Sequence, residues 1–481
     1  MNVPRAMSTQ HPDNVGVPFF APNAVMGGED EIREAFYAFS HLGCDEQMWD
    51  FEGKEVDEFV VEKLLSQYEA FFREHPLGER VFLTPRVPNP ALEKAQAKVL
   101  LEVLHSIPRH SDVARLFYGR EREPIVELIF PMTTSADELG RVATYYRERV
   151  GALADDGELK AWFGEFRPRE IGVIPLIEDR PSLLRADEIL REHVRAARPP
   201  YQRVFIARSD PALNYGMAGA VLLSLLALER LDRLERELEV PLYPILGVGG
   251  APFRGGLRPD SVARVLARYP SAQTFTIQSA FKYDHAQADV VRAVDELRRS
   301  PRGRPLALEE ARALRVCDRV AARYGEAVAA LAPLIRQVAA QVPRRRMRKL
   351  HIGLFGYSRS ANGASLPRAI PFCAALYAIG LPPEILGLAG LDDDDREWLL
   401  AAVPCLSSDL RDALAYLDPE VARFLPAVAE DVAVAERLRE RAPDAAHLEL
   451  ARAANRSVRE GETQQLGDLV ARQGAIRHFL G

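Results

Sequence analysis

The sequence predicts an α/β protein built on a (β/α)8 barrel of the TIM type, with many additional helices. Short apolar runs alternate with long amphipathic stretches, which is typical of parallel strands joined by crossover helices. There are seven or eight such units, and this number favours a closed barrel over a smaller open sheet. Polar and chargeable residues follow the apolar runs, as they do at the carboxyl-terminal face of barrel enzymes.

The predicted strands are short runs rich in Val, Ile, Leu and Phe. Seven of them lie at residues 81–83, 125–130, 171–177, 204–207, 242–247, 274–277 and 352–355, and residues 385–388 are a weaker eighth candidate. Amphipathic stretches predict helices at residues 137–150, 182–197, 218–238, 260–268 and 306–342. Together these elements place the barrel at roughly residues 80–390.

The chain shows no internal repeat and no Gly/Ser-rich linker, so a single catalytic domain over residues 1–481 is the simplest organisation. Its N-terminal segment is expected to pack on the barrel. From about residue 399 to the end the pattern is almost all helical, and we expect this strongly helical C-terminal region to pack outside or across the barrel.

Composition and charge exclude several classes of protein. Hydrophobic residues make up 47% and charged residues 27%, which is globular composition. Lys and Arg number 62 against 69 Asp and Glu, and the net charge of −7 argues against a dedicated nucleic-acid binder. Four scattered cysteines without a Cys-x-x-Cys pair indicate thiols in a reducing compartment. No run reaches the ~18 apolar residues of a membrane span and the polar N-terminus is no signal peptide, so we expect a cytoplasmic protein.

Two carboxylates follow neighbouring predicted strands. Glu178 directly ends one apolar run, and Asp210 follows the next by two residues. With no His or Cys nearby, this pair suits a hard, oxygen-preferring cation such as Mg²⁺ or Mn²⁺. The alternative is a pair of surface carboxylates bound to Arg180 and Arg208.

A glycine-rich loop follows the run at residues 242–247 and carries Arg254, Gly255 and Gly256. Glycine lets the backbone approach an anion closely, and arginine adds a two-pronged donor. The loop has neither the Gly-Lys-Ser/Thr of a P-loop nor dinucleotide-fingerprint spacing. A tight turn is the alternative interpretation.

Other basic residues stand on loops after predicted strands. Arg86, Arg359 and Arg368 would each be solvated alone, whereas several on one face would form a pocket for phosphate and carboxylate. For Lys282, an internal ion partner and a solvated residue both remain open. The basic run at residues 344–349 is expected at the opposite end of the barrel, as a solvated face or a subunit contact.

His11 lies in a polar N-terminal segment, where a histidine is ordinarily exposed. If this segment folds over the barrel mouth, its near-neutral pKa makes His11 the best general base available.

On these motifs the chain resembles phosphoenolpyruvate carboxylase, in the short archaeal-type form. Residues 7–14, MSTQHPDN, and residues 43–54, GCDEQMWDFEGK, are similar to two signatures of that form. The resemblance covers essentially the whole chain, from His11 to Gly481.

The resemblance implies roles for individual residues. Thr9-x-His11-Pro12 is similar to the motif that carries the catalytic histidine, and Arg254 stands in the second half of the family's glycine-rich loop. Glu178 and Asp210 match its metal ligands. Substrate-binding positions are implied for Arg86, Gly255, Gly256, Gln278, Lys282, Arg359, Arg368 and Arg477. The first arginine of the long enzymes' glycine-rich loop and the Asn-Thr of their tail are absent, which leaves one phosphate contact and inhibition by aspartate without a sequence basis.

The implied reaction is the irreversible carboxylation of phosphoenolpyruvate by bicarbonate, giving oxaloacetate and phosphate through carboxyphosphate and an enolate. Mg²⁺ or Mn²⁺ is the implied cofactor, and a homotetramer without nucleic-acid or membrane partners is the implied assembly. Two other classes remain open: another Mg²⁺-dependent lyase or aldolase on a phosphoenolpyruvate/pyruvate-type barrel, and a non-catalytic barrel that binds ligands.

Overall fold

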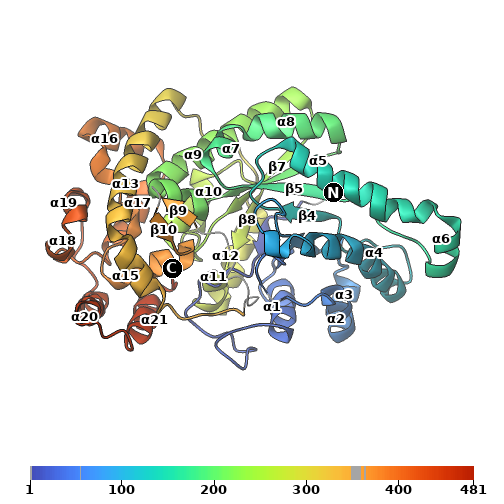
Figure 1. Cartoon of the computed structure of the whole chain (residues 1–481), viewed down its shortest axis with the longest axis horizontal. Coiled ribbons are helices and arrows are strands. Elements are labelled where there is room, and N and C mark those ends of the chain that lie inside the picture. The colour runs from blue at the N-terminus through green and yellow to red at the C-terminus, as the bar shows by residue number, and fades with distance from the viewer. Residues whose placement is uncertain (1–2, 55, 348–358, 362–363) are drawn as a thin grey trace.

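The computed structural model describes residues 3–54, 56–347, 359–361 and 364–481. At its centre eight parallel strands close into a barrel, and helices surround them (Figure 1). In order around the barrel the strands are β1 (Ala6–Ser8), β2 (Glu46–Asp50), β3 (Phe82–Arg86), β4 (Glu127–Phe130), β5 (Gly172–Ile177), β6 (Gln202–Ala207), β7 (Leu242–Gly247) and β8 (Thr274–Ile277). The predicted (β/α)8 fold is confirmed.

The barrel begins earlier in the chain than predicted. Its strands span residues 6–277, whereas the sequence suggested roughly 80–390. The two missed strands lack an apolar run, because β1 has only three residues and β2 carries buried polar side chains such as Glu46 and Asp50. The strand predicted at residues 385–388 is wrong, since consecutive prolines lead into the short 3₁₀ helix η5 (Pro383–Ile385). The strand predicted at residues 352–355 lies outside the described residues.

Closure joins the first strand to the last. β1 runs parallel to β8 with Met7 opposite Thr276, and Thr9 N donates to Ile277 O at 3.0 Å. Because all eight strands are parallel, the segments that follow them meet at one rim of the barrel.

The opposite, amino-terminal end of the barrel is closed by a buried polar layer from alternate strands. Arg203 on β6 donates to both carboxylate oxygens of Glu46 at 2.7 Å, to Glu127 at 3.2 Å and to Thr274 at 3.4 Å. The layer above it is apolar and consists of Met7, Met48, Ile129, Ile174, Leu176, Phe205, Ala207 and Ile245. A filled interior leaves the carboxyl-terminal rim as the place for chemistry.

The helices confirm most of the predicted positions. Around the barrel lie α1 (Glu29–Ser40), α2 (Val60–Gln67), α3 (Glu69–Glu74), α4 (Val99–Tyr118), α5 (Ala136–Tyr145), α6 (Gly157–Phe163), α7 (Arg180–Leu184), α8 (Ala186–Ala197), α9 (Ser209–Leu238), α10 (Val262–Arg268), α11 (Ser279–Tyr283) and α12 (Gln287–Arg299). α9 extends further toward its N-terminus than predicted and contains a break at Gly216, whose φ is 75°.

The C-terminal third is strongly helical, as predicted for its last part, and gathers on one side of the barrel (Figure 1, left). It comprises α13 (Glu310–Ala339), the hairpin β9 (Arg359–Ala361) and β10 (Ala364–Leu366), α15 (Ala369–Ala378), α16 (Asp393–Ala402), α17 (Leu406–Leu414), α18 (Val421–Phe424), α19 (Ala429–Arg437), α20 (Ala445–Glu460) and α21 (Leu466–Arg477). α13 packs along α9.

One helix of the described part, α9, is long and apolar enough to cross a membrane, and α15 would pass the same test jointly with residues Pro383–Gly390. The most apolar window of α9 is 89% buried inside the protein, as expected of a core helix.

Candidate active site

Candidate functional residues from six strands meet at the carboxyl-terminal rim. They follow or end β1, β3, β5, β6, β7 and β8, respectively, and are His11, Arg86, Glu178, Asp210, Arg254 and Gln278. Parallel strands account for this convergence, because residues far apart in sequence share one end of the barrel.

His11 is partly buried at this rim, and its Nδ1 lies 2.9 Å from Thr9 Oγ1. Burial, and then the positive charges around it, hold the pKa of His11 well below its ordinary value. The charges that act on it belong to Lys54, Arg86, Arg254 and Arg368. The imidazole is therefore neutral and able to accept a proton inside a cationic surrounding.

Arg254 is almost completely buried, at 1% exposure, and its guanidinium is held from several sides. Nη1 donates to Asp13 at 3.1 Å and to the carbonyl oxygen of Gly481 at 2.7 Å. Nε donates to Ser209 at 3.2 Å, and Nη2 donates to the side-chain oxygen of Gln278. Arg254 thus sits between the loops after β6, β7 and β8.

The glycines of the loop make room for this arginine. A Cβ on Gly249 would lie 2.8 Å from the guanidinium carbon of Arg254, and one on Gly255 would lie 2.4 Å from Val248 Cγ1. Gly255 and Gly256 have φ values of 114° and 68°, which favour glycine. The loop is therefore shaped to bury Arg254 at the rim.

Arg86 is oriented by a carboxylate that the sequence did not single out. Its Nε and Nη2 each donate to Asp50 at 2.8 Å, and Asp50 is its register partner in the β2–β3 ladder. Glu52 lies 3.2 Å from Arg86, and Lys54 pairs with Asp50. Asp50 and Lys54 stand four residues apart in the 43–54 signature, which is the signal that could have identified them.

Glu178 and Asp210 are brought to the same end of neighbouring strands. Glu178 follows β5, and Asp210 lies in the first turn of α9 after β6. These strands pair in parallel with Ile177 opposite Ile206. Of the two arginines named as alternative partners, Arg180 forms an ion pair with Asp318, and Arg208 Nε donates to the Tyr269 hydroxyl at 3.0 Å.

The donor set at Glu178 and Asp210 fits a hard divalent cation. Both ligands are oxygens, as Mg²⁺ prefers. Within the described part of the chain no group of three or more His, Cys, Asp or Glu is placed to hold a metal. A cation bound by this pair would therefore keep positions for water or substrate oxygens.

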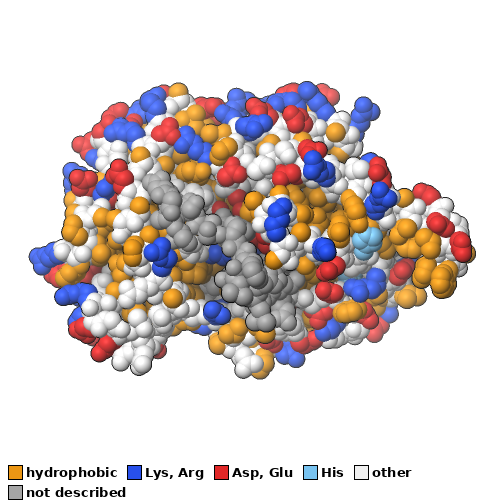
Figure 2. All heavy atoms as spheres, viewed as in Figure 1, with side chains coloured by type: hydrophobic (Ala, Val, Ile, Leu, Met, Phe, Trp, Pro, Cys, Tyr) orange, Lys and Arg blue, Asp and Glu red, His pale blue; other side chains and the backbone are white. Residues whose placement is uncertain are grey.

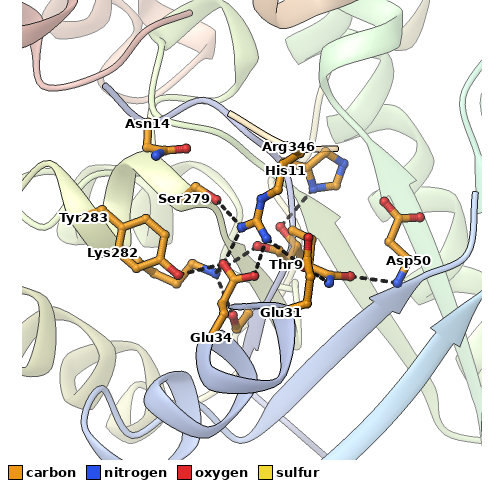
Figure 3. A network of polar contacts seen from close by, with 12 residues as sticks. Thr9, His11, Asn14, Glu31, Glu34, Asp50, Ser279, Lys282, Tyr283 and Arg346 are labelled. Carbon is orange, nitrogen blue, oxygen red and sulfur yellow. Dashed lines mark hydrogen bonds and ion pairs between the residues drawn. The ribbon is translucent and has the colours of Figure 1, made fainter. Parts of the chain in front are cut away.

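Lys282 is an internal ion partner rather than a solvated residue. It is 2% exposed, and its Nζ donates to Ser8 Oγ and Thr9 O at 2.9 Å and to Glu34 at 2.7 Å (Figure 3). Its three protons are used inside the fold, two of them on the segment that precedes His11.

Arg346 corrects the expectation for the basic run at residues 344–349. Instead of lying on a solvated face, Arg346 is buried and pairs with Glu31 and Glu34, and it also donates to Ser279 at 3.2 Å (Figure 3). Burial alone would raise the pKa of Glu34, but the charges of Arg346 and Lys282 hold it well below its ordinary value. A buried ionic network therefore supports the rim beneath His11.

Three candidate arginines remain, Arg368, Arg359 and Arg477, and they lie in different parts of the fold. Arg368 directly precedes α15, and its charge acts on His11 and, with that of Arg86, on Glu93. Arg359 lies on β9, but its side chain falls outside the described part. Arg477 donates to Leu480 O at 3.0 Å and lines a cavity of about 290 Å³. The described residues that line this cavity do not include His11.

The similarity of this chain to known proteins extends over its whole length. Residues 3–481 match the family described as phosphoenolpyruvate carboxylase. A phosphoenolpyruvate carboxylase of Methanothermobacter thermautotrophicus is 51% identical over 100% of both chains. The Methanospirillum hungatei enzyme of that name is 49% identical over 100% of both, and that of Pyrococcus abyssi is 53% identical over 87% of this chain and 90% of its own. The chain belongs to the phosphoenolpyruvate carboxylase family.

Proposed function

We propose that this protein carboxylates phosphoenolpyruvate with bicarbonate, giving oxaloacetate and phosphate. The observation that carries the proposal is a neutral histidine, His11, enclosed by the charges of Lys54, Arg86, Arg254 and Arg368. This cluster offers several cations to a substrate with a phosphate and a carboxylate, and one base to a reaction that must release a proton.

In the first step an oxygen of bicarbonate attacks phosphorus, and the bond from phosphorus to the enol oxygen breaks. The products are carboxyphosphate and the enolate of pyruvate. We assign the substrate phosphate and carboxylate to Arg86, Arg359 and Arg368. A divalent cation, Mg²⁺ or Mn²⁺, held by Glu178 and Asp210 would supply positive charge that stabilises the developing enolate.

In the second step His11 accepts the proton of carboxyphosphate, which breaks down to CO₂ and phosphate. Its lowered pKa suits this role, because the imidazole is unprotonated when the substrate arrives. Arg254 holds carboxyphosphate or CO₂ beside the enolate, and C3 of the enolate then attacks CO₂ to form oxaloacetate.

The other assigned residues act around these groups. Gln278 accepts from Arg254 and fixes its plane, together with the loop of Gly255 and Gly256. Lys282 acts through the backbone of Thr9, and Arg477 through the tail carbonyl of Leu480. Water must be kept from the enolate, since protonation there gives pyruvate. We assign the closure of this space to the N-terminal segment and the glycine-rich loop.

One assay tests the proposal and separates it from the alternatives. Purified protein is mixed with phosphoenolpyruvate and Mg²⁺, with and without bicarbonate, and oxaloacetate and phosphate are measured. We expect oxaloacetate only with bicarbonate. Turnover of phosphoenolpyruvate at the same rate with and without bicarbonate would favour a different lyase or aldolase. Binding of phosphoenolpyruvate without turnover would favour a non-catalytic barrel.

We further propose a single catalytic unit that assembles as a cytoplasmic homotetramer without nucleic-acid or membrane partners. Free cysteines support a reducing compartment, with Cys44, Cys317 and Cys373 buried. On the face in Figure 2 basic and acidic side chains are interspersed, which does not favour a polyanion. Exposed apolar side chains at the ends of α4 and α6, Leu116 at 75% and Trp162 at 78%, support a subunit contact. Light scattering coupled to size exclusion tests the assembly.

A further inference from the structure

We propose that Asp13 is a positioning residue that holds Arg254 in register with His11, and that it thereby directs the enolate toward oxaloacetate rather than pyruvate. The inference rests on the roles given above to Arg254 and His11. Asp13 itself was assigned no function by its motif, although it stands only two residues after the histidine.

The Asp13 carboxylate joins the segments after three strands. Oδ2 accepts from Arg254 Nη1 at 3.1 Å and from Gly250 N at 3.2 Å, both in the loop after β7. Oδ1 accepts from Ala280 N at 2.7 Å, in α11 after β8. Asp13 follows β1 and is 0% exposed, so this junction is formed wholly inside the protein.

The charge of Asp13 matters because of what else holds Arg254. Two of the other acceptors described for this guanidinium are uncharged, the Ser209 hydroxyl and the Gln278 amide oxygen, and the third is a main-chain oxygen of Gly481, the last residue of the sequence. Asp13 is the side-chain carboxylate that forms an ion pair with Arg254. Without the Asp13 carboxylate, the buried guanidinium of Arg254 would move toward another anion. At this rim the anionic substrates would be such partners.

The same segment fixes the base. The carbonyl oxygen of His11 accepts from Asp13 N at 3.1 Å and from Ser279 N at 3.3 Å, and the carbonyl oxygen of Asp13 accepts from Leu480 N at 2.6 Å. Asp13 therefore links the position of the general base to that of the arginine, because it is two residues from His11 in the chain and forms an ion pair with Arg254. Movement of one relative to the other would release CO₂ away from the enolate.

Asp284 provides a matched control on the same segment. Asp284 directly follows α11, and its two carboxylate oxygens accept from Val15 N and Gly16 N at 2.7 Å. It anchors the N-terminal segment just beyond Asp13 through backbone groups, not through Arg254. A substitution of Asp284 should therefore loosen the N-terminal segment and leave the ion pair of Asp13 with Arg254 in place.

The experiment compares the wild type with Asp13→Asn and Asp284→Asn. Each protein receives phosphoenolpyruvate, Mg²⁺ and bicarbonate, and oxaloacetate, pyruvate and phosphate are quantified under initial-rate conditions. For Asp13→Asn we expect a fall of at least about 10-fold in the ratio of oxaloacetate to pyruvate, with phosphate release reduced less than oxaloacetate formation. Asp284→Asn should keep the wild-type ratio, whatever its thermal stability.

Two results would overturn the inference: an unchanged product ratio in Asp13→Asn, or an equal shift in Asp284→Asn, which would mean general loosening. If Asp13→Asn does not fold, Asp13→Glu decides the matter, since it keeps the charge but displaces the guanidinium. An Asp13→Glu protein with wild-type melting temperature and wild-type ratio would also reject the inference. A wild-type protein that forms no oxaloacetate would instead reject the proposed function.

Discussion

At the scale of single residues, the candidate site depends on keeping His11 neutral. Burial and neighbouring cations both disfavour its protonated form, so the ring is a base before substrate binds. The same cations attract the substrate, and one set of charges therefore serves both binding and base catalysis.

Replacing His11 with Asn should separate the two proposed steps. Oxaloacetate formation should fall by about 10²–10⁴-fold, the usual contribution of a general base, because carboxyphosphate loses its proton acceptor. Some bicarbonate-dependent phosphate release should persist, since the attack on phosphorus precedes the proton transfer. Parallel assays of oxaloacetate and phosphate check this, and equal loss of both would remove His11 from the second step.

Replacing Asp210 with Ala should abolish turnover at ordinary Mg²⁺ concentrations and weaken Mn²⁺ binding at least about 10-fold, because one of two carboxylate ligands is gone. Mn²⁺ binding can be followed by electron paramagnetic resonance without substrate. Asp318→Ala is the control, since this carboxylate is 59% exposed and pairs with Arg180. Wild-type metal affinity in the Asp210 variant would exclude Asp210 as a ligand.

At the scale of elements, the two ends of the barrel have different tasks. The amino-terminal end holds the ionic layer of Glu46, Glu127 and Arg203, all buried, whereas the carboxyl-terminal rim holds the candidate site. Burial raises the pKa of Glu127, and the charge of Arg203 opposes this. Buried charges at the amino-terminal end therefore belong to the fold, whereas those at the carboxyl-terminal rim belong to the candidate site.

Replacing Arg203 with Met should destabilise the fold by about 3–5 kcal/mol, because two buried carboxylates lose their partner. Turnover of the folded enzyme should stay within about 2-fold of wild type, since Arg203 lies at the far end of the barrel. Arg141→Met on α5 is the control: Arg141 and Asp137 are 79% and 68% exposed, and the loss should be below ~1 kcal/mol. Urea unfolding checks both, and similar losses in the two variants would contradict the prediction.

At the scale of the whole molecule, Glu384 connects the C-terminal third to the glycine-rich loop. Its Oε1 accepts from Phe253 N at 2.8 Å and from the Tyr377 hydroxyl at 2.7 Å. Burial raises the pKa of Glu384 to about 7. Because the folded pKa exceeds the ordinary value of 4.5, the stabilisation from this carboxyl is complete below pH 4.5 and is lost as the pH rises toward 7.

Replacing Glu384 with Gln should remove this pH dependence, since Gln resembles the protonated carboxyl and cannot ionise. Relative to wild type, the free energy of unfolding of the variant should rise by about 2–3 kcal/mol between pH 5 and pH 8. Urea titrations of both proteins across this range measure the difference. If the free energies of unfolding of the two proteins changed equally with pH, Glu384 would not titrate near neutrality in the folded protein.

Much of the barrel could be predicted because parallel strands that are buried on both faces contain apolar runs, and β4 to β7 each contain such a run. β1 and β2 were missed because Ser8, Glu46 and Asp50 are polar side chains, and their partners lie on elements far away in the sequence. Local sequence patterns cannot show partners that are far apart in the chain. Asp50 N donates to Gln10, 40 residues away, and Glu46 accepts from Arg203, 157 residues away.

Local periodicity and motifs such as the one around His11 were enough to infer the fold class, the family and the residues with suitable chemistry. Contacts between distant segments were needed to show that Lys282 and Arg346 are internal ion partners and that Asp13 meets Arg254. The physical reason is that the role of a charge is set by the counter-charges and burial around it. Those arise from loops of different strands, which meet only when the barrel closes.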